Sequence, residues 1–194
     1  MEITTDVIKA LREETGVSIM QCKKALEEAG GDMEKAKVIL RKVSVAIASK
    51  KADRTLGAGV ASAYTHAGNS VVGAVVLLCE TDFVSKNEEF QKLAYGIAMH
   101  VAAMNPQFRS REDITEADLK AAREVFEKEA QNIPEIARAK ALQGKIDSYL
   151  SERVLLEQSY VKDPSVTIRT LIDSAIQKFG EKIEVIRFER LSVK

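Results

Sequence analysis

The apolar run Val71–Cys79 constrains the fold more than any other stretch of this sequence. It is too short to cross a membrane as a helix, and Gly73 interrupts it. A nearly continuous apolar run of this length is typical of a strand that is buried on both faces. A second strand-like run, Val60–His66, precedes it, and the segment Ala67–Asn69 between them predicts a hairpin turn. The chain must therefore fold around an antiparallel pair of strands that other elements cover.

An amphipathic helix that can cover these strands follows directly. Ser85, with Glu88 three residues later, predicts a capping box at its start. Seven apolar residues then recur at the spacing of one buried stripe: Phe90, Leu93, Ala94, Ile97, Ala98, Val101 and Ala102. Asn105 and Pro106 end the helix. The segment 81–84 is thus the turn between a buried strand and a buried helix, and such a turn lies near the surface.

The first 45 residues predict a small bundle of three short helices. Each helix begins at a capping residue, Thr5, Ser18 or Asp32, and Ser18 forms a capping box with Gln21. Gly16 ends the first helix. The predicted core residues of this bundle are Val7, Ile8, Leu11, Met20, Ala25, Leu26, Met33, Ala36, Ile39 and Leu40. Such a thin core stabilises the bundle by only a few kcal/mol.

Residues 46–56 are predicted to be a linker, because the charged run Lys50–Arg54 shows no periodicity before Gly57. A basic run of this kind can contact RNA, but a solvated linker or helix end is the commoner outcome. The whole chain carries 29 basic and 29 acidic residues, whereas nucleic-acid-binding proteins are usually basic. The neutral balance favours a protein partner over a nucleic acid.

Two helical stretches, Thr115–Gln131 and Ile136–Val154, are separated by a short break at which Pro134 suits a first helical position. Helices joined by so short a break favour an antiparallel helical hairpin, which we expect over residues 115–157.

A C-terminal module is predicted over residues 158–194. It begins with a loop at 161–164, continues with an amphipathic helix over Ile168–Phe179 that Gly180 ends, and closes with a strand over Ile183–Leu191. The fold class is therefore α+β, with a core of antiparallel strands packed with helices. The predicted divisions are a three-helix domain at 1–45, a linker at 46–56 and the core at 57–194.

No pattern typical of a catalytic or metal site is present in the sequence. The cysteines Cys22 and Cys79 are far apart and form no metal-binding pair, which indicates a reducing compartment. A lone helical histidine such as His100 is more often a packed, hydrogen-bonded residue than a ligand. We therefore expect no metal, no cofactor and no enzymatic activity. The acidic N-terminus is no signal peptide, so we expect a cytoplasmic protein, or an organellar one whose targeting segment has been removed, without a membrane segment.

Two acids, Glu80 and Asp82, leave an alternative open. A strand would place them on the same face, as paired acids for acid–base or metal chemistry together with His66. In the other interpretation they flank the turn and interact favourably with the dipole of the following helix. We favour the second interpretation.

Phe83, in the same turn, also has two interpretations. It packs beneath the following helix, as many phenylalanines do, or it is held at the surface for a partner. Burying an exposed phenylalanine in a partner gains roughly 1.5–3 kcal/mol, and aromatic residues are typical interface anchors. Residue chemistry alone leaves both open, with the core as the commoner outcome.

Several segments resemble the bacterial elongation factor Ts family, in order along nearly the whole chain. Thr15–Leu26 resembles its N-terminal signature, and Cys79–Val84 with Asn87 resembles a second and more specific one. Gln158–Lys162 resembles a third shared segment, and Ala98–Ala102 also fits the family.

The resemblance implies a guanine-nucleotide exchange factor for the GTPase elongation factor Tu. It also implies that the N-terminal bundle has the ubiquitin-associated fold and docks on the GTPase domain, which leaves ubiquitin binding as a rival interpretation. Phe83 would be a wedge near the Mg²⁺ and phosphate site of the partner. The implied contact residues are Thr81, Asp82, Phe83 and Val84 in the turn, His66 after the first strand, and Ile19, Met20 and Lys23 in the bundle.

The sequence departs from the family pattern at a few positions. Val76 and Leu78 replace the usual Glu and Asn before the cysteine, Gln21 replaces Asp, and Ser18–Ile19 replaces Gly-Met. These changes leave the Phe83 turn intact. The chain resembles the short form of the family, with a single core, and short members pair as homodimers. We therefore expect a homodimer that binds elongation factor Tu.

Overall fold

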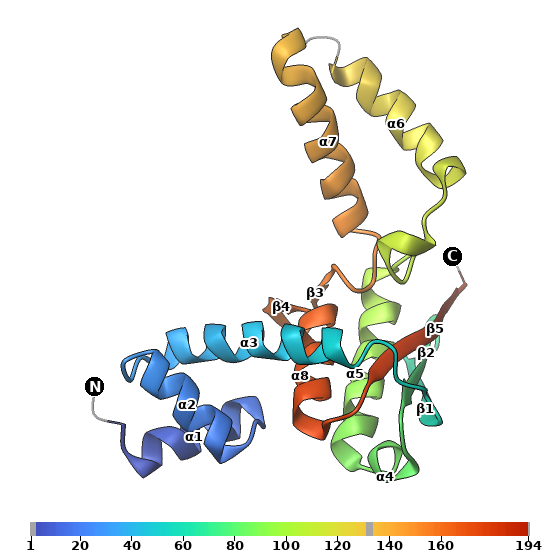
Figure 1. Cartoon of the computed structure of the whole chain (residues 1–194). Coiled ribbons are helices and arrows are strands. Elements are labelled where there is room, and N and C mark those ends of the chain that lie inside the picture. The colour runs from blue at the N-terminus through green and yellow to red at the C-terminus, as the bar shows by residue number, and fades with distance from the viewer. Residues whose placement is uncertain (1–2, 131–133, 194) are drawn as a thin grey trace. The chain divides into compact units, whose positions relative to one another are not determined.

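The structure is a computed structural model that describes residues 3–130 and 134–193 (Figure 1). Its helices are α1 Thr5–Thr15, α2 Ile19–Glu28, α3 Met33–Lys50, α4 Asp82–Ser85, α5 Glu88–Met104, α6 Glu116–Ala130, α7 Glu135–Ser151 and α8 Ile168–Phe179, with a 3₁₀ turn at Arg111–Asp113. Its strands are β1 Ala58–Thr65, β2 Val71–Cys79, β3 Ser159–Tyr160, β4 Asp163–Thr167 and β5 Ile183–Ser192. The predicted α+β class, with N-terminal helices followed by antiparallel strands and helices, is confirmed.

The chain divides into two compact units that each combine separate stretches. The first contains Met1–Ser62, Val75–Gly96 and Arg169–Ile186, and the second contains Ala63–Ala74, Ile97–Ile168 and Arg187–Lys194. These units are not the predicted domains, because β2, α5 and β5 each contribute residues to both. The division at residues 45 and 57 stays a prediction.

The three N-terminal helices form the predicted bundle. The N-cap of α1 is Thr4, one residue before the predicted Thr5, and its hydroxyl accepts the Val7 N–H at 3.4 Å. Asp32 caps α3 as predicted, by accepting the Lys35 N–H at 3.0 Å. The buried core of the bundle consists of Ile8, Leu11, Val17, Cys22, Ala25, Leu26, Ala36 and Leu40. Met20 was expected in this core and is exposed instead.

The predicted linker at 46–56 starts too early. α3 continues to Lys50, so the first five residues of that segment are helical. No glycine or proline lies between the start of α3 and Gly57, and a charged run alone does not end a helix. The basic side chains beyond α3 are bound within the chain: Lys51 Nζ donates to the Gly180 carbonyl at 2.6 Å. The segment that follows α3 is tethered and is not a freely solvated linker.

The sheet has the strand order β1-β2-β5. The predicted hairpin between β1 and β2 is confirmed: Gly68 and Asn69 both have positive φ, and the Asn69 N–H donates to the His66 carbonyl at 3.0 Å. The hydrogen-bonded turn has Ala67 and Gly68 at its centre, and Gly68 supplies the positive φ that a residue with a side chain rarely adopts.

The prediction that β2 is buried on both faces is wrong. Gly73, Val75, Leu77 and Cys79 are buried, whereas the alternating residues between them are only half-buried. The strand is apolar on both faces, but helices such as α5 cover only one of them (Figure 1). One face of the sheet therefore stays partly open.

Gly73 lies where β2 meets α5. A Cβ atom added at this position would lie 2.6 Å from the backbone nitrogen of Ala102 and would also overlap the carbonyl oxygen of Ala98. Both atoms belong to the helix backbone and cannot move aside as a side chain would. β2 and α5 can therefore approach this closely only because residue 73 is a glycine, which has no Cβ atom.

His100, on α5, is fully buried and hydrogen-bonded at both ring nitrogens. Its Nδ1 accepts the Val161 N–H at 3.2 Å, so its Nε2 carries the proton and donates to Gln158 Oε1 at 2.9 Å. The prediction of a packed, hydrogen-bonded histidine is confirmed. Burial lowers the pKa of His100 below its ordinary value of 6.5, and the bond to Gln158 only partly offsets this.

This lowered pKa predicts a loss of stability in mild acid. Below about pH 6.5 the unfolded chain binds a proton at His100 and the folded chain does not, so the free energy of unfolding falls by up to about 1.4 kcal/mol per pH unit until the folded pKa is reached. Urea denaturation between pH 7.5 and 5 measures this slope, and His100→Gln is expected to remove it. An unchanged slope in that variant would show that another group is responsible.

The helical hairpin is formed by α6 and α7, which lie side by side (Figure 1). Ile146, Leu150 and Val154 form its buried cluster. Pro134 is the N-cap of α7 and not its first residue, and α7 ends at Ser151, before the predicted Val154. The predicted break at Asn132 and Ile133, and the predicted end of the first helix at Gln131, lie outside the described residues.

Part of the predicted loop at 161–164 is a strand. Ser159–Tyr160 and Asp163–Thr167 pair antiparallel as β3 and β4. The helix α8 and the strand β5 agree with the predicted C-terminal module, and Gly180 has the positive φ expected of a residue that ends a helix.

Candidate partner-binding site

The turn after β2 is a short helix. Residues Asp82–Ser85 form α4, and the Lys86 N–H donates to the Asp82 carbonyl at 3.1 Å. The predicted capping box at Ser85 is wrong. Asn87 caps α5 instead, since its side-chain oxygen accepts the Glu89 N–H at 2.9 Å, while the Ser85 hydroxyl donates back to the Asp82 carbonyl. Ser85 is occupied within α4, so the next polar residue supplies the cap.

Phe83 projects from this helix into solvent. It is 82% exposed, whereas its neighbour Val84 is 3% exposed. Successive residues of a helix point about 100° apart, so Val84 anchors α4 to the core while Phe83 faces outward. The interpretation of Phe83 as a core residue is therefore wrong.

The N-terminus of α4 is capped from a distant part of the chain. Thr81 is its N-cap residue, but its own side chain makes no capping bond. The carboxylate of Glu181 instead accepts the N–H groups of Glu80 at 3.1 Å and Thr81 at 3.0 Å, together with the Thr81 hydroxyl at 2.5 Å. Glu181 follows α8, so it links the start of β5 to the end of β2.

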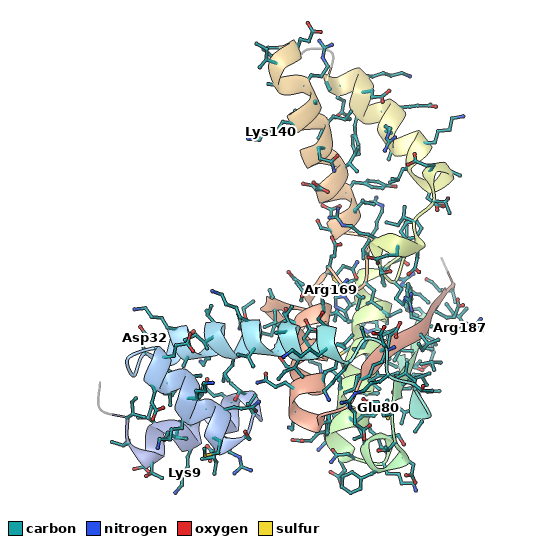
Figure 2. All side chains as sticks on the ribbon, viewed as in Figure 1. Lys9, Asp32, Glu80, Lys140, Arg169 and Arg187 are labelled. Atoms are coloured by element: carbon teal, nitrogen blue, oxygen red, sulfur yellow. The ribbon has the colours of Figure 1, made fainter. Side chains whose placement is uncertain are left out.

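Glu80, which Figure 2 labels, makes the reciprocal contact. Its carboxylate accepts the backbone N–H of Lys182 at 2.5 Å, and both of its oxygens accept from one nitrogen of Arg54, Nη1, at 3.1 and 3.2 Å. These bonds, that from Lys182 foremost, lower the pKa of Glu80. A carboxylate that is saturated and ionised in this way is poorly suited to acid catalysis at neutral pH.

Asp82 lies at the surface. Its carboxylate accepts a hydrogen bond from Lys86 Nζ at 2.6 Å, and this bond is the main cause of its lowered pKa. The two acids thus have separate partners, Glu80 in the Arg54 and Lys182 cluster and Asp82 on α4. This arrangement agrees with acids that flank a turn and does not resemble a catalytic pair.

Three predicted contact residues lie on α2. Met20 is 75% exposed and Ile19 is 48% exposed. Lys23 is also at the surface, where its ammonium group lies 3.8 Å from Glu27. Ser18 begins this helix by accepting the Gln21 N–H at 3.4 Å, while its hydroxyl donates to Gln21 Oε1 at 3.1 Å. A rigid helix start therefore presents two apolar side chains and a cation.

His66 belongs to the second compact unit. It lies just after β1, and its backbone N–H donates to the Val71 carbonyl at 2.9 Å. Its exposed ring nitrogen Nδ1 lies 3.2 Å from the Tyr64 hydroxyl. The hairpin turn thus fixes the backbone of His66, and Tyr64 orients its ring.

Two features of residues 3–130 and 134–193 bear on rival functions. Within them, no group of three or more His, Cys, Asp or Glu side chains is arranged to hold a metal ion. No helix among them has the length and apolar character that a bilayer span needs. In the basic run, Arg54 is paired with Glu80, and Lys51 bonds to a backbone carbonyl.

Sequence reasoning missed Glu181 and Lys182 and placed Arg54 in a linker. Glu181 is separated from Thr81 by a hundred residues, and no local pattern marks it as a cap. The sequence does show that no local capping box forms at Thr81, because neither Glu nor Gln follows it at the required spacing. This absence indicates that a partner for the Thr81 N–H has to come from elsewhere in the chain.

Comparison with known proteins gives a consistent result. The family model for elongation factor TS matches residues 2–194. The chain is 45% identical over 197 residues to elongation factor Ts of Herpetosiphon aurantiacus, covering 100% of this chain and 98% of the relative. It is 44% identical over 193 residues to that of Thermotoga petrophila, covering 100% and 97%. It is 44% identical over 191 residues to that of Desulforamulus reducens, covering 97% and 88%.

Proposed function

Because this chain belongs to the elongation factor Ts family of translation elongation factors, we propose that it is a guanine-nucleotide exchange factor for elongation factor Tu. It accelerates GDP release without covalent chemistry and acts in the cytoplasm. The observation that carries this proposal is the exposed Phe83 on a helix that is tied to the core on its other side.

Phe83 is proposed to act as a wedge near the Mg²⁺ and phosphate site of the GTPase. Its ring makes little contact within its own chain, so nearly all of its burial free energy is available to a partner. That free energy amounts to roughly 1.5–3 kcal/mol. Thr81, Asp82 and Val84 hold the short helix: Val84 in the core, Thr81 at the Glu181 carboxylate, and Asp82 in its pair with Lys86.

The N-terminal bundle is proposed to dock on the GTPase domain through Ile19, Met20 and Lys23. Exposed methionine and isoleucine side chains offer apolar contact, and methionine adapts readily to an irregular surface. This contact is indifferent to nucleotide and supplies affinity, whereas the Phe83 contact favours the nucleotide-free state. His66 is proposed as a further contact residue.

The proposal is tested by release of a fluorescent GDP analogue from purified elongation factor Tu. Substoichiometric amounts of the chain are expected to accelerate release through many turnovers, because the factor leaves each GTPase unchanged. The cognate Tu without the chain gives the uncatalysed rate. Release at that same rate in the presence of the chain, over a range of concentrations up to excess, would rule the proposal out.

We also propose that the chain pairs as a homodimer through the open face of its sheet. Val76 and Leu78 alternate with the buried residues of β2, and Ile186 is exposed next to the buried Val185 of β5. At Val76 and Leu78 the sequence is more apolar than the family pattern. A second copy of the same sheet would remove these side chains from water.

Sedimentation equilibrium tests the dimer. We expect the wild-type chain to have twice the mass of one chain, and Ile186→Glu to shift it toward the monomer, because burying an unpaired carboxylate is costly. Val125→Glu, at an exposed position on α6, is the matched control and is expected to leave the mass unchanged. A wild-type monomer, or equal effects of the two variants, would contradict the proposal.

A further inference from the structure

Glu181 ties the residues just before the Phe83 helix to the segment that leads into β5. We infer that Glu181 is a positioning residue for nucleotide exchange, which holds α4 so that Phe83 meets the partner in a fixed orientation. This inference rests on the proposed exchange function. Glu181 lies at the start of the segment leading into β5 and does not belong to the predicted contact residues.

The helix α4 is very short. Its four residues leave every backbone N–H at its start without a partner inside the helix. An isolated turn of this length is unstable in water, because the cost of fixing its dihedral angles outweighs the few hydrogen bonds that it forms. The conformation of Phe83 therefore depends on contacts from outside α4.

Several contacts supply that support. Ser85 is buried and its carbonyl accepts a hydrogen bond from Gln91 Nε2 at 3.4 Å, while Cys79 Sγ donates to the Thr81 carbonyl at 3.2 Å. Val84 is buried and fixes α4 to the core. At the N-terminal side, the Glu181 carboxylate accepts three hydrogen bonds, from the N–H of Glu80, the N–H of Thr81 and the Thr81 hydroxyl. Hydrogen bonds to an ionised carboxylate are about twice as strong as those between neutral groups. The negative charge also faces the positive end of the short helix.

The contact is reciprocal, which makes it rigid. Glu80 accepts the N–H of Lys182, the residue after Glu181, while Glu181 accepts the N–H of Glu80. Each carboxylate thus binds the backbone of the other segment, and Arg54 Nη1 adds an ion pair with both oxygens of Glu80. A single bond would allow α4 to pivot, whereas this double connection fixes the distance and the direction of the residues just before Phe83.

The inference has a direct physical consequence for exchange. A wedge that moves freely must lose that freedom when it enters the partner, and this loss lowers the affinity for the state in which the wedge is inserted. Docking through other residues is not affected. Loss of Glu181 is therefore expected to lower the maximal rate of GDP release, with little change in the concentration of chain that gives half of that rate.

The first test measures motion and does not depend on exchange. The sequence contains no tryptophan, so Phe83→Trp introduces a single indole whose fluorescence anisotropy reports on α4. Adding Glu181→Ala is expected to lower the anisotropy of the folded protein. The matched control is Asp113→Ala, because Asp113 likewise accepts a backbone N–H at 3.0 Å and a hydroxyl at 3.1 Å, both from Ser110. Unchanged anisotropy in Glu181→Ala, or an equal decrease in the control, would overturn the inference.

The second test asks whether Glu181 acts through Phe83. We expect Glu181→Ala to lower the maximal rate of GDP release by about tenfold in the wild-type chain and not to lower it further in the Phe83→Ala chain. Equal decreases in both backgrounds would reduce Glu181 to a general structural role. If the wild-type chain fails to accelerate release at all, the exchange function is refuted, while the anisotropy measurement still decides whether Glu181 holds α4.

Discussion

The Phe83→Ala chain is expected to bind elongation factor Tu. At a saturating concentration of this chain, GDP leaves Tu roughly 10- to 100-fold more slowly than with the wild-type chain. The estimate follows from the roughly 1.5–3 kcal/mol that a buried phenylalanine side chain contributes, at tenfold for every 1.4 kcal/mol. Since the Phe83 ring is 82% exposed, its removal is expected to leave the urea denaturation midpoint unchanged. The measurement is the rate of fluorescent GDP release against the concentration of chain.

Met20→Ala gives the contrasting variant for the same experiment. Met20 is also exposed, but the proposal assigns it to docking on α2. Its truncation is expected to raise the concentration of chain needed for half-maximal release while the maximal rate stays close to wild type. If Phe83→Ala releases GDP at the wild-type rate, the wedge is refuted. If Met20→Ala leaves the affinity for Tu untouched, its docking role is refuted.

The Gly73→Ala chain is expected to be the least stable of the variants considered, with a free energy of unfolding lower by about 3 kcal/mol or more. The added Cβ would overlap the carbonyl oxygen of Ala98 and lie 2.6 Å from the nitrogen of Ala102. Because both belong to the backbone of α5, strand and helix must move apart, and the packing between them is lost. Urea denaturation measures the effect.

Gly144→Ala is the matched control for this variant. Gly144 lies inside α7, and a Cβ added there would meet no atom within 4 Å. Alanine favours the helix by roughly 0.5–1 kcal/mol over glycine, so this chain is expected to be as stable as the wild type or slightly more so. Equal destabilisation by the two substitutions would mean that the close contact at Gly73 is not what limits its replacement.

Features set by local chemistry could be predicted from the sequence. Caps and turns act on neighbouring backbone groups, so the local sequence indicates where they occur. Examples are the capping oxygens of Ser18 and Asp32, the glycine that ends α1, and the hairpin turn at Gly68 and Asn69. The apolar stripe of α5 was predicted from the helical spacing of its apolar residues, which is also a property of the local sequence. These elements gave the α+β class.

Features set by distant contacts could not be predicted. The composition of β2 shows that both of its faces are apolar, but not that only one is covered. The turn at Phe83 has the same local sequence whether its ring is buried or exposed, and its support comes from Glu181, a hundred residues away. Likewise, Lys51 and Arg54 resemble a solvated basic run until their partners, the Gly180 carbonyl and Glu80, are brought next to them by folding.

The affinity of the chain for elongation factor Tu, measured with and without bound GDP, decides whether the chain is an exchange factor. An exchange factor has to bind the nucleotide-free GTPase more tightly, and by linkage GDP then weakens its binding by the same factor. We predict that nucleotide-free Tu binds the chain at least about tenfold more tightly than GDP-bound Tu, which corresponds to about 1.4 kcal/mol of coupling. Equal affinities would contradict the account, because a ligand that binds both states equally well shifts neither.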